Sequence, residues 1–130
     1  MATFKCFEDI EAWQNGRKLT NSIYKITSSG AFAKDFGLRE QIRKAGVSVM
    51  SNIAEGFERG GAREFIQFLS ISKGSTGEVK SQLFVALDQG YIDSVSFDQL
   101  YSSATQTGKL IAGLMNYLRK SGIKGNKFKE

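Results

Sequence analysis

Apolar residues recur along this chain at spacings of three and four, which is the period of an α-helix. Four segments carry the pattern, at residues 7–28, 36–58, 62–89 and 97–121. Asp35 and Ser96 are expected to cap the second and fourth helices, and Gly90 to end the third. Four helices of about twenty residues joined by short loops predict an all-α fold, an antiparallel up-down-up-down four-helix bundle.

The third predicted helix is apolar on more than one side. Phe65, Leu69 and Leu83 follow one stripe, whereas Ile66 and Phe84 lie about 100° away around the helix. A helix with two apolar sides needs more than one packing partner. It is therefore expected to be central in the bundle or to take part in an interface between copies.

Glycines interrupt the predicted helices, although each costs about 1 kcal/mol relative to alanine in a helix interior. They are Gly46, Gly56, Gly74, Gly77, Gly108 and Gly113. Such a cost is usually offset where two helix backbones approach closely, and kinks or frayed turns are the alternative. We predict close approach, in particular at Gly74 and Gly77.

A polar stripe follows one side of the second predicted helix. Its members are Ser48, Asn52, Glu55 and Arg59, at spacings of four, three and four. Ser75 and Glu78 occupy a corresponding side of the third helix. Three interpretations remain open: a solvated face with an ordinary Glu55–Arg59 pair, a hydrogen-bonded network between helices or subunits anchored by Asn52 and Glu78, or a ligand-binding surface. The candidate assembly residues are Ser48, Asn52, Glu55, Gly74, Ser75 and Glu78.

Composition indicates a small helical protein with a basic end. The 130 residues include no proline, and a single cysteine cannot form an internal disulfide, which favours a reducing, cytoplasmic location. No segment is long and apolar enough for a membrane span. Residues 1–122 are expected to form the bundle and 123–130 a disordered basic tail. Residues 119–130 carry five basic side chains and one acidic one, so most of the net charge of +5 lies there.

The residue types argue against an enzyme. The chain has no histidine, which excludes histidine acid–base catalysis and histidine metal ligands. No glycine-rich phosphate loop follows a strand, and the Glu-x-x-His pairs of metal-binding bundles are absent. Cys6, near one end, is expected to be a bystander. No cofactor or metal is predicted.

Basic side chains of the second and third predicted helices are the candidate contacts to nucleic acid. They are Arg39, Arg43, Lys44, Arg59, Arg63 and Lys73. Such groups bind phosphates by displacing counterions. The local excess of charge is small, because Glu40, Glu55, Glu58 and Glu64 lie on the same helices. Pairing within a helix is therefore the default expectation for several of them.

Several motifs resemble a known family. They are Phe-Glu-Asp-Ile-Glu-Ala-Trp at 7–13, Phe-Gly-Leu-Arg-Glu-Gln-Ile-Arg-Lys-Ala at 36–45, Val-Ser-Val-Met-Ser-Asn-Ile-Ala-Glu-Gly at 47–56 and Lys-Gly-Ser-Thr-Gly-Glu at 73–78. The chain resembles, over about residues 4–120, the four-helix-bundle family encoded in intervening sequences of bacterial 23S ribosomal RNA genes, often labelled S23 ribosomal protein. The family is similar to the accessory protein of diversity-generating retroelements, which works with a reverse transcriptase and RNA.

The resemblance implies a barrel-like homopentamer of four-helix bundles with a role in nucleic-acid binding. Two departures are visible: residues 31–35 lack the proline usual in the family, and Lys44 replaces an arginine, which keeps the charge but not the bidentate geometry. The first hypothesis is a non-enzymatic oligomer that binds RNA or DNA, or a nucleic-acid enzyme. The alternative is a structural scaffold or protein-interaction module that does not bind nucleic acid.

Overall fold

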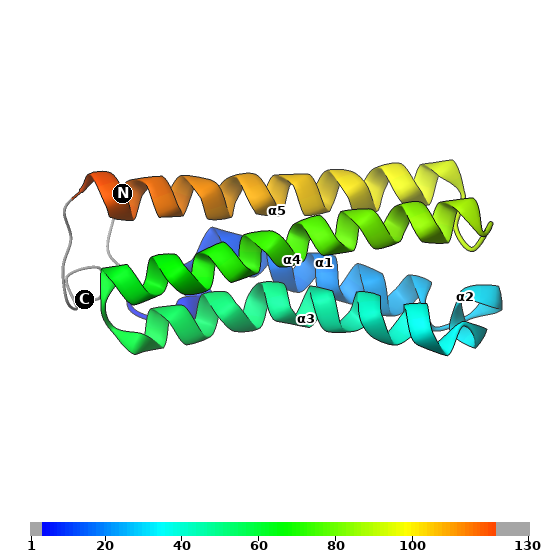
Figure 1. Ribbon diagram of the computed structural model, residues 1–130, viewed down its shortest axis with the longest axis horizontal. Helices are drawn as coiled ribbons and strands as arrows, with labels where there is room; N and C mark the ends of the chain where they lie inside the picture. Colours follow the sequence, from blue (N-terminus) through cyan, green and yellow to red (C-terminus); the bar gives the residue numbers. More distant parts are fainter. Residues whose placement is uncertain (1–3, 122–130) are drawn as a thin grey trace.

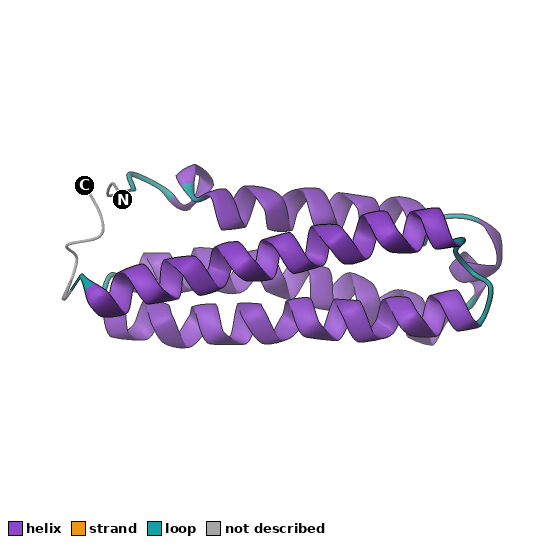
Figure 2. Ribbon diagram, turned by 90° about the horizontal axis from the view of Figure 1, so that it is seen from above, coloured by secondary structure: helices purple, strands orange, loops and turns teal. Residues whose placement is uncertain are grey.

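Four long antiparallel helices make up most of the computed structural model, which describes residues 4–121 (Figure 1). They are α1 (Glu11–Ile26), α3 (Phe36–Arg59), α4 (Ala62–Asp88) and α5 (Ser94–Lys120). Each helix packs against two neighbours, in the order α1, α3, α4, α5 and back to α1. All elements drawn for these residues are helical (Figure 2). The predicted all-α up-down-up-down bundle is confirmed, whereas the predicted tail at 123–130 lies outside the described residues.

The first predicted helix, at 7–28, is wrong as a continuous element. A short 3-10 helix, η1 (Phe7–Asp9), precedes α1, and Ile10 between them has an extended backbone. The Ile10 side chain is buried in the core, and its carbonyl oxygen accepts the first helical hydrogen bond from the Gln14 amide. After α1 the chain forms another short helix, α2 (Gly30–Lys34), which periodicity over five residues did not reveal.

Helix α3 begins as predicted, and α5 does not. The Asp35 carboxylate accepts a hydrogen bond from the Leu38 amide, which confirms the cap of α3. Helix α5 begins at Ser94, three residues before the predicted start, because Asp93 rather than Ser96 is its cap. Asp93 accepts from the Ser96 amide at 2.8 Å, and this bond lowers the pKa of the Asp93 carboxyl. Gly90 has φ +73° and provides the left-handed turn that ends α4.

The core consists of two apolar clusters, one towards each end of the bundle. One gathers around Phe57, Phe65 and Leu118, and the other around Phe32 and Leu83. Each of these side chains has at most 2 % of its surface exposed. Small and polar residues occupy the helices between the clusters, of which Gly108 is half-buried and the others are buried: Gly16, Thr20, Gly46, Ser72, Thr76, Thr107 and Gly108. We call this layer the waist. There the Thr20 hydroxyl donates to the Gly46 carbonyl oxygen at 2.9 Å and joins α1 to α3.

The glycine prediction is half correct. A Cβ atom on Gly46, Gly56 or Gly108 would lie 3.1 Å or less from a side-chain atom of a neighbouring helix, so these glycines do permit close approach. Gly74, Gly77 and Gly113 have no such neighbour within 4 Å. The prediction of close packing at Gly74 and Gly77 is therefore wrong. The physical reason is their position, because both lie on exposed sides of α4.

Candidate nucleic-acid interface

Helices α3 and α4 meet along a tight contact that we call the seam (Ser48, Val49, Asn52, Gly56, Phe65, Phe68, Ser72 and Ser75). A Cβ atom on Gly56 would lie 2.6 Å from the Phe68 Cβ, which no real pair of such atoms tolerates. The buried Ser72 hydroxyl donates to the Val49 carbonyl oxygen at 2.6 Å. A helix carbonyl has a second lone pair, so this bond joins α4 to α3 without breaking the backbone ladder of α3.

The outer edge of the seam carries a small hydrogen-bond network. The hydroxyl oxygens of Ser48 and Ser75 lie 2.8 Å apart, across the two helices. The Asn52 amide donates to both the carbonyl and the hydroxyl oxygen of Ser48, at 2.9 and 3.0 Å. Three of the six candidate assembly residues therefore come together within one chain. What Asn52 does between chains stays a prediction.

The other three candidates lie apart from this network. Glu55 pairs with Arg59 at 3.0 Å, with about half of each side chain exposed. Such exposed pairs on one helix contribute about 0.3–0.5 kcal/mol. Glu78 accepts a hydrogen bond from the Gln82 side chain instead of bonding to Asn52. Gly74 is exposed, with no side chain against it.

Two of the candidate arginines, near the start of α3, contact the end of α1 and the helix α2. The Arg39 guanidinium lies over the Phe36 ring, donates to the Ala33 carbonyl oxygen at 2.9 Å and pairs with Glu40. The Arg43 guanidinium lies 4.5 Å from the centre of the Tyr24 ring. Its Nε donates to the hydroxyl of Thr27 at the end of α1, at 2.8 Å. These contacts engage some of the five N–H donors of each guanidinium and fix its position on the protein.

The remaining candidates are exposed. Arg59 adds to its ion pair a contact with the Phe68 ring, 5.1 Å from its centre. Lys44, Arg63 and Lys73 form no ion pair within the described part of the chain. They do not converge: Lys44 lines a hollow beside Glu78 on the α3–α4 side, Arg63 lies in the first turn of α4, and Lys73 faces α5.

Sequence reasoning missed two lysines that the tertiary structure places beside Lys73. Lys80 follows Lys73 by seven residues, two helical turns along α4, and Lys109 comes from α5. With small residues between them, the three line an open groove of about 290 Å³, which we call the lysine groove. The spacing on α4 is visible in the sequence, whereas the approach of Lys109 depends on how α5 docks.

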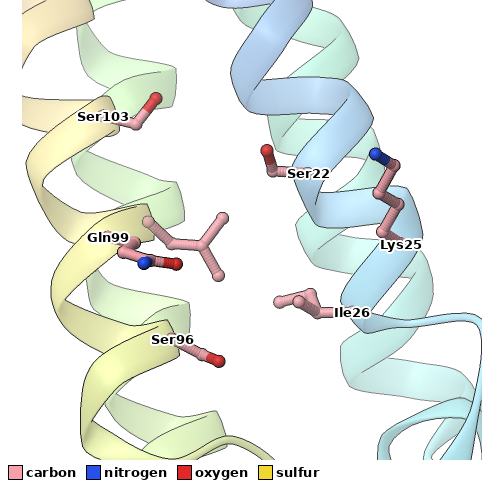
Figure 3. A pocket seen from close by; sticks show the side chains of 7 residues that line it. Ser22, Lys25, Ile26, Ser96, Gln99 and Ser103 are labelled. Atoms are coloured by element: carbon pink, nitrogen blue, oxygen red, sulfur yellow. The ribbon is translucent and has the colours of Figure 1, made fainter.

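A second groove, between α1 and α5, is lined by polar and apolar side chains and holds no cluster of charge. Figure 3 shows Ser22 and Ile26 of α1 across from Ser96, Gln99 and Ser103 of α5, while Lys25 runs along α1. The groove has a volume of about 210 Å³. Serine hydroxyls without a neighbouring base are weak nucleophiles. The groove therefore offers polar contacts and no activated group.

Two other titratable side chains, Cys6 and Tyr91, have a raised pKa. Partial burial, with the carboxylates of Asp9 and Glu8, raises the pKa of the Cys6 thiol, which keeps it protonated and weakly nucleophilic. A hydrogen bond to Asp35 at 2.9 Å raises the pKa of the Tyr91 hydroxyl. Among residues 4–121, no group of three or more acidic or cysteine side chains could hold a metal ion. In the same range, no helix is long and apolar enough to cross a membrane.

Comparison with known proteins gives the chain a family. Residues 8–113 match the profile of the 23S rRNA-intervening sequence protein family. The chain belongs to that family. The resemblance drawn from the sequence motifs is thus confirmed.

A solved structure has a similar fold. A crystal structure of an S23 ribosomal protein family member of unknown function, from Bacteroides thetaiotaomicron VPI-5482, superposes with a TM-score of 0.73 at 21 % identity. The match covers 80 % of this chain and 97 % of that one. At this identity the likeness concerns the fold alone. A search of curated proteins finds no relative.

Proposed function

We propose that this member of the intervening-sequence family is a non-enzymatic, self-assembling bundle that binds nucleic acid, preferably RNA. The observation that carries the proposal is a set of basic side chains on α3 and α4 that form no ion pair within residues 4–121, namely Lys44, Arg63 and Lys73. Exposed cations without intramolecular partners are available to displace counterions from phosphates. Family membership supports the choice of RNA, because the family takes its name from ribosomal RNA genes.

Self-assembly is supported by the outer side of α4. Ile71 and Val85 leave about half of their surface exposed, 53 % and 44 %, although α4 already packs against α3 and α5. They lie fourteen residues apart, which places them on nearly the same side of the helix. Apolar side chains aligned in this way favour a contact with another copy. A homopentamer is the expectation from the family, and the location proposed for the assembly is cytoplasmic.

The binding proposal is tested with the full chain and a structured RNA at several salt concentrations. Each phosphate contact to single-stranded or duplex nucleic acid contributes a slope of about −0.7 to −0.9 in log affinity against log salt. We expect measurable affinity at low salt and a slope that corresponds to several contacts. Absence of binding at low salt contradicts the proposal.

The scaffold alternative is favoured by one observation: Arg39, Arg43 and Arg59 are already engaged within the chain. Under that alternative, Asn52→Ala or Glu78→Ala separates the subunits. No variant changes RNA binding, because the wild type binds no RNA. Light scattering coupled to size exclusion measures the subunit number, and Ile71→Glu provides an independent break at the exposed side of α4. A wild-type monomer contradicts the assembly part of both proposals.

A further inference from the structure

The lysine groove lies between α4 and α5, and the waist residues Thr76 and Gly108 line it. A Cβ atom on Gly108 would lie 3.1 Å from the Thr76 hydroxyl oxygen, so the Thr76 side chain packs directly on this glycine. Gly77 lines the same groove, and a Cβ atom there would have no neighbour within 4 Å. The small side chains of the waist thus leave open space above the backbone, and the lysines stand around it.

Positive charge in the groove is not balanced by the protein. Between Phe65 and Leu87 on α4, and between Gln99 and Leu118 on α5, the one acidic residue is Glu78. It lines the hollow on the α3–α4 side, where it bonds to Gln82. None of the three lysines forms an ion pair within residues 4–121, and Lys80 has only the Tyr101 ring, 4.7 Å from its centre. Three like charges around one groove repel one another, and an anion removes that repulsion.

Thr105, in the wall of this groove, has a buried hydroxyl oxygen without a hydrogen-bond partner. The other threonines described on these helices and at their ends, Thr20, Thr27, Thr76 and Thr107, each donate to a carbonyl oxygen one turn earlier. A buried hydroxyl is normally bonded, and threonine in a helix has two accessible χ1 rotamers. Rotation about χ1 can therefore bring this hydroxyl to a ligand in the groove.

We propose that the lysine groove binds phosphate groups, which contact the ammonium groups of Lys73, Lys80 and Lys109 and the Thr105 hydroxyl. Lysine is a frequent phosphate ligand, because its compact charge and three donors suit an oxyanion approached from several directions. The proposed function, on which this part of the inference rests, identifies the phosphate as one of a nucleic-acid backbone. Lys73 and Lys80 are about 10 Å apart along the helix axis, so the groove runs along a strand rather than enclosing a single ion.

The test compares two double variants of the full chain with equal loss of charge. Lys73→Gln/Lys109→Gln removes two of the three lysines of the groove. Lys18→Gln/Lys34→Gln removes two exposed lysines from α1 and α2. The probes are a labelled twelve-nucleotide oligouridine, followed by fluorescence anisotropy, and inorganic phosphate, followed by amide chemical shifts. For the groove variant we expect an affinity about tenfold weaker at low salt and a salt slope smaller by about 1.4, two contacts at 0.7 each. The control variant keeps the wild-type slope.

The four outcomes separate this inference from the proposed function. A selective loss in the groove variant supports both. Equal losses in the two variants, with oligouridine bound by the wild type, overturn the groove and leave nucleic-acid binding standing. Amide shifts at Gly77, Thr105 and Gly108 with inorganic phosphate, without oligouridine binding, support the groove and overturn the nucleic-acid function. Binding of neither probe overturns both.

Three further variants guard against misfolding as an explanation. Thr105→Val keeps the shape of the side chain and removes the hydroxyl, and we expect weaker phosphate binding with an unchanged helical spectrum. Thr107→Val, two residues away but buried and already bonded to the Ser103 carbonyl oxygen, is the matched control. Unchanged phosphate binding by Thr105→Val would show that Thr105 is not part of the site. In that case Gly77→Leu, which fills the groove from an exposed side of the helix, must abolish binding if phosphate binds in the groove.

Discussion

Helix α4 meets its two neighbours in opposite ways. Towards α3, at the seam, Gly56 brings the backbones together and the Ser72 hydroxyl has a partner in the Val49 carbonyl oxygen. Towards α5, at the lysine groove, Gly77 faces open space and the Thr105 hydroxyl has none. Both contacts are built from glycines and small hydroxyl residues, and both lie in or beside the waist.

The difference shows that residue type alone does not tell packing from binding. Small and polar residues on a helix are explained by packing where each group finds a partner inside the chain, as at the seam. Where partners are missing, as at the lysine groove, the same residues are explained by a ligand. Four substitutions sharpen or break this comparison.

Gly56→Ala is expected to have the largest effect. The added Cβ atom would meet the Phe68 Cβ at 2.6 Å and a Phe65 ring atom at 3.0 Å, and the Phe68 Cβ cannot move without its backbone. Overpacking of this kind costs about 3 kcal/mol at its upper end, and the better helix propensity of alanine returns about 1 kcal/mol. We expect a net loss of about 2 kcal/mol in the free energy of unfolding, measured by urea denaturation. An unchanged stability would show that the seam is not tight.

Thr105→Val is expected to stabilise the free protein by about 1 kcal/mol, because it removes a buried hydroxyl that has no partner. Threonine and valine have similar helix propensities, so the backbone contributes little. Thr107→Val should destabilise the protein by a similar amount, because the Thr107 hydroxyl forms a hydrogen bond that the variant loses. Thermal unfolding of both variants, without phosphate in the buffer, gives the comparison. Equal signs for the two would contradict the assignment of an unbonded hydroxyl at the groove.

Gly77→Ala is expected to raise stability by slightly under 1 kcal/mol, the helix-propensity difference, because the new methyl group meets nothing within 4 Å. Gly56→Ala is expected to change stability with the opposite sign. Comparing the two variants therefore compares the tightness of packing at the seam with that at the groove. Urea denaturation of both variants under identical conditions is sufficient. A loss of stability at Gly77 would indicate a close contact there.

Glu55→Gln is expected to have the smallest effect. It breaks the exposed pair with Arg59 at the outer edge of the seam and should cost about 0.3–0.5 kcal/mol at low salt. Near 1 M salt the Debye length falls to about 3 Å, and the difference should vanish. A larger or salt-independent loss would place Glu55 in a buried contact, such as one between subunits.

Much of the fold was accessible from periodicity. Helices α3 and α4 fall within one residue of their predicted bounds, because both are long, strongly periodic and limited by Asp35 and by Gly60, which has φ +90°. The failures lie at the ends of other elements. Ile10 leaves the helical conformation so that its side chain can enter the core, and Asp93 competes successfully with Ser96 as a cap.

The candidate site was predicted less well. Arg39 and Arg43 were predicted to contact nucleic acid. Each donates part of its hydrogen bonds to a backbone or hydroxyl oxygen from the α1–α2 region, which no spacing in the sequence could reveal. Lys80 and Lys109 were overlooked, because neither belongs to a motif and one of them comes from another helix. Contacts between helices far apart in the chain depend on the rotation of each helix about its axis.

The sequence by itself determined the class of the fold, the long helices and the family, because hydrophobic period, caps and left-handed glycines act over a few residues. It also supplied the small residues of the waist. Only the tertiary structure decided which of them pack and which stay open. Atoms from another helix pack on Gly56 and bond to Ser72, whereas a Cβ at Gly77 has no neighbour within 4 Å and the Thr105 hydroxyl has no hydrogen-bond partner.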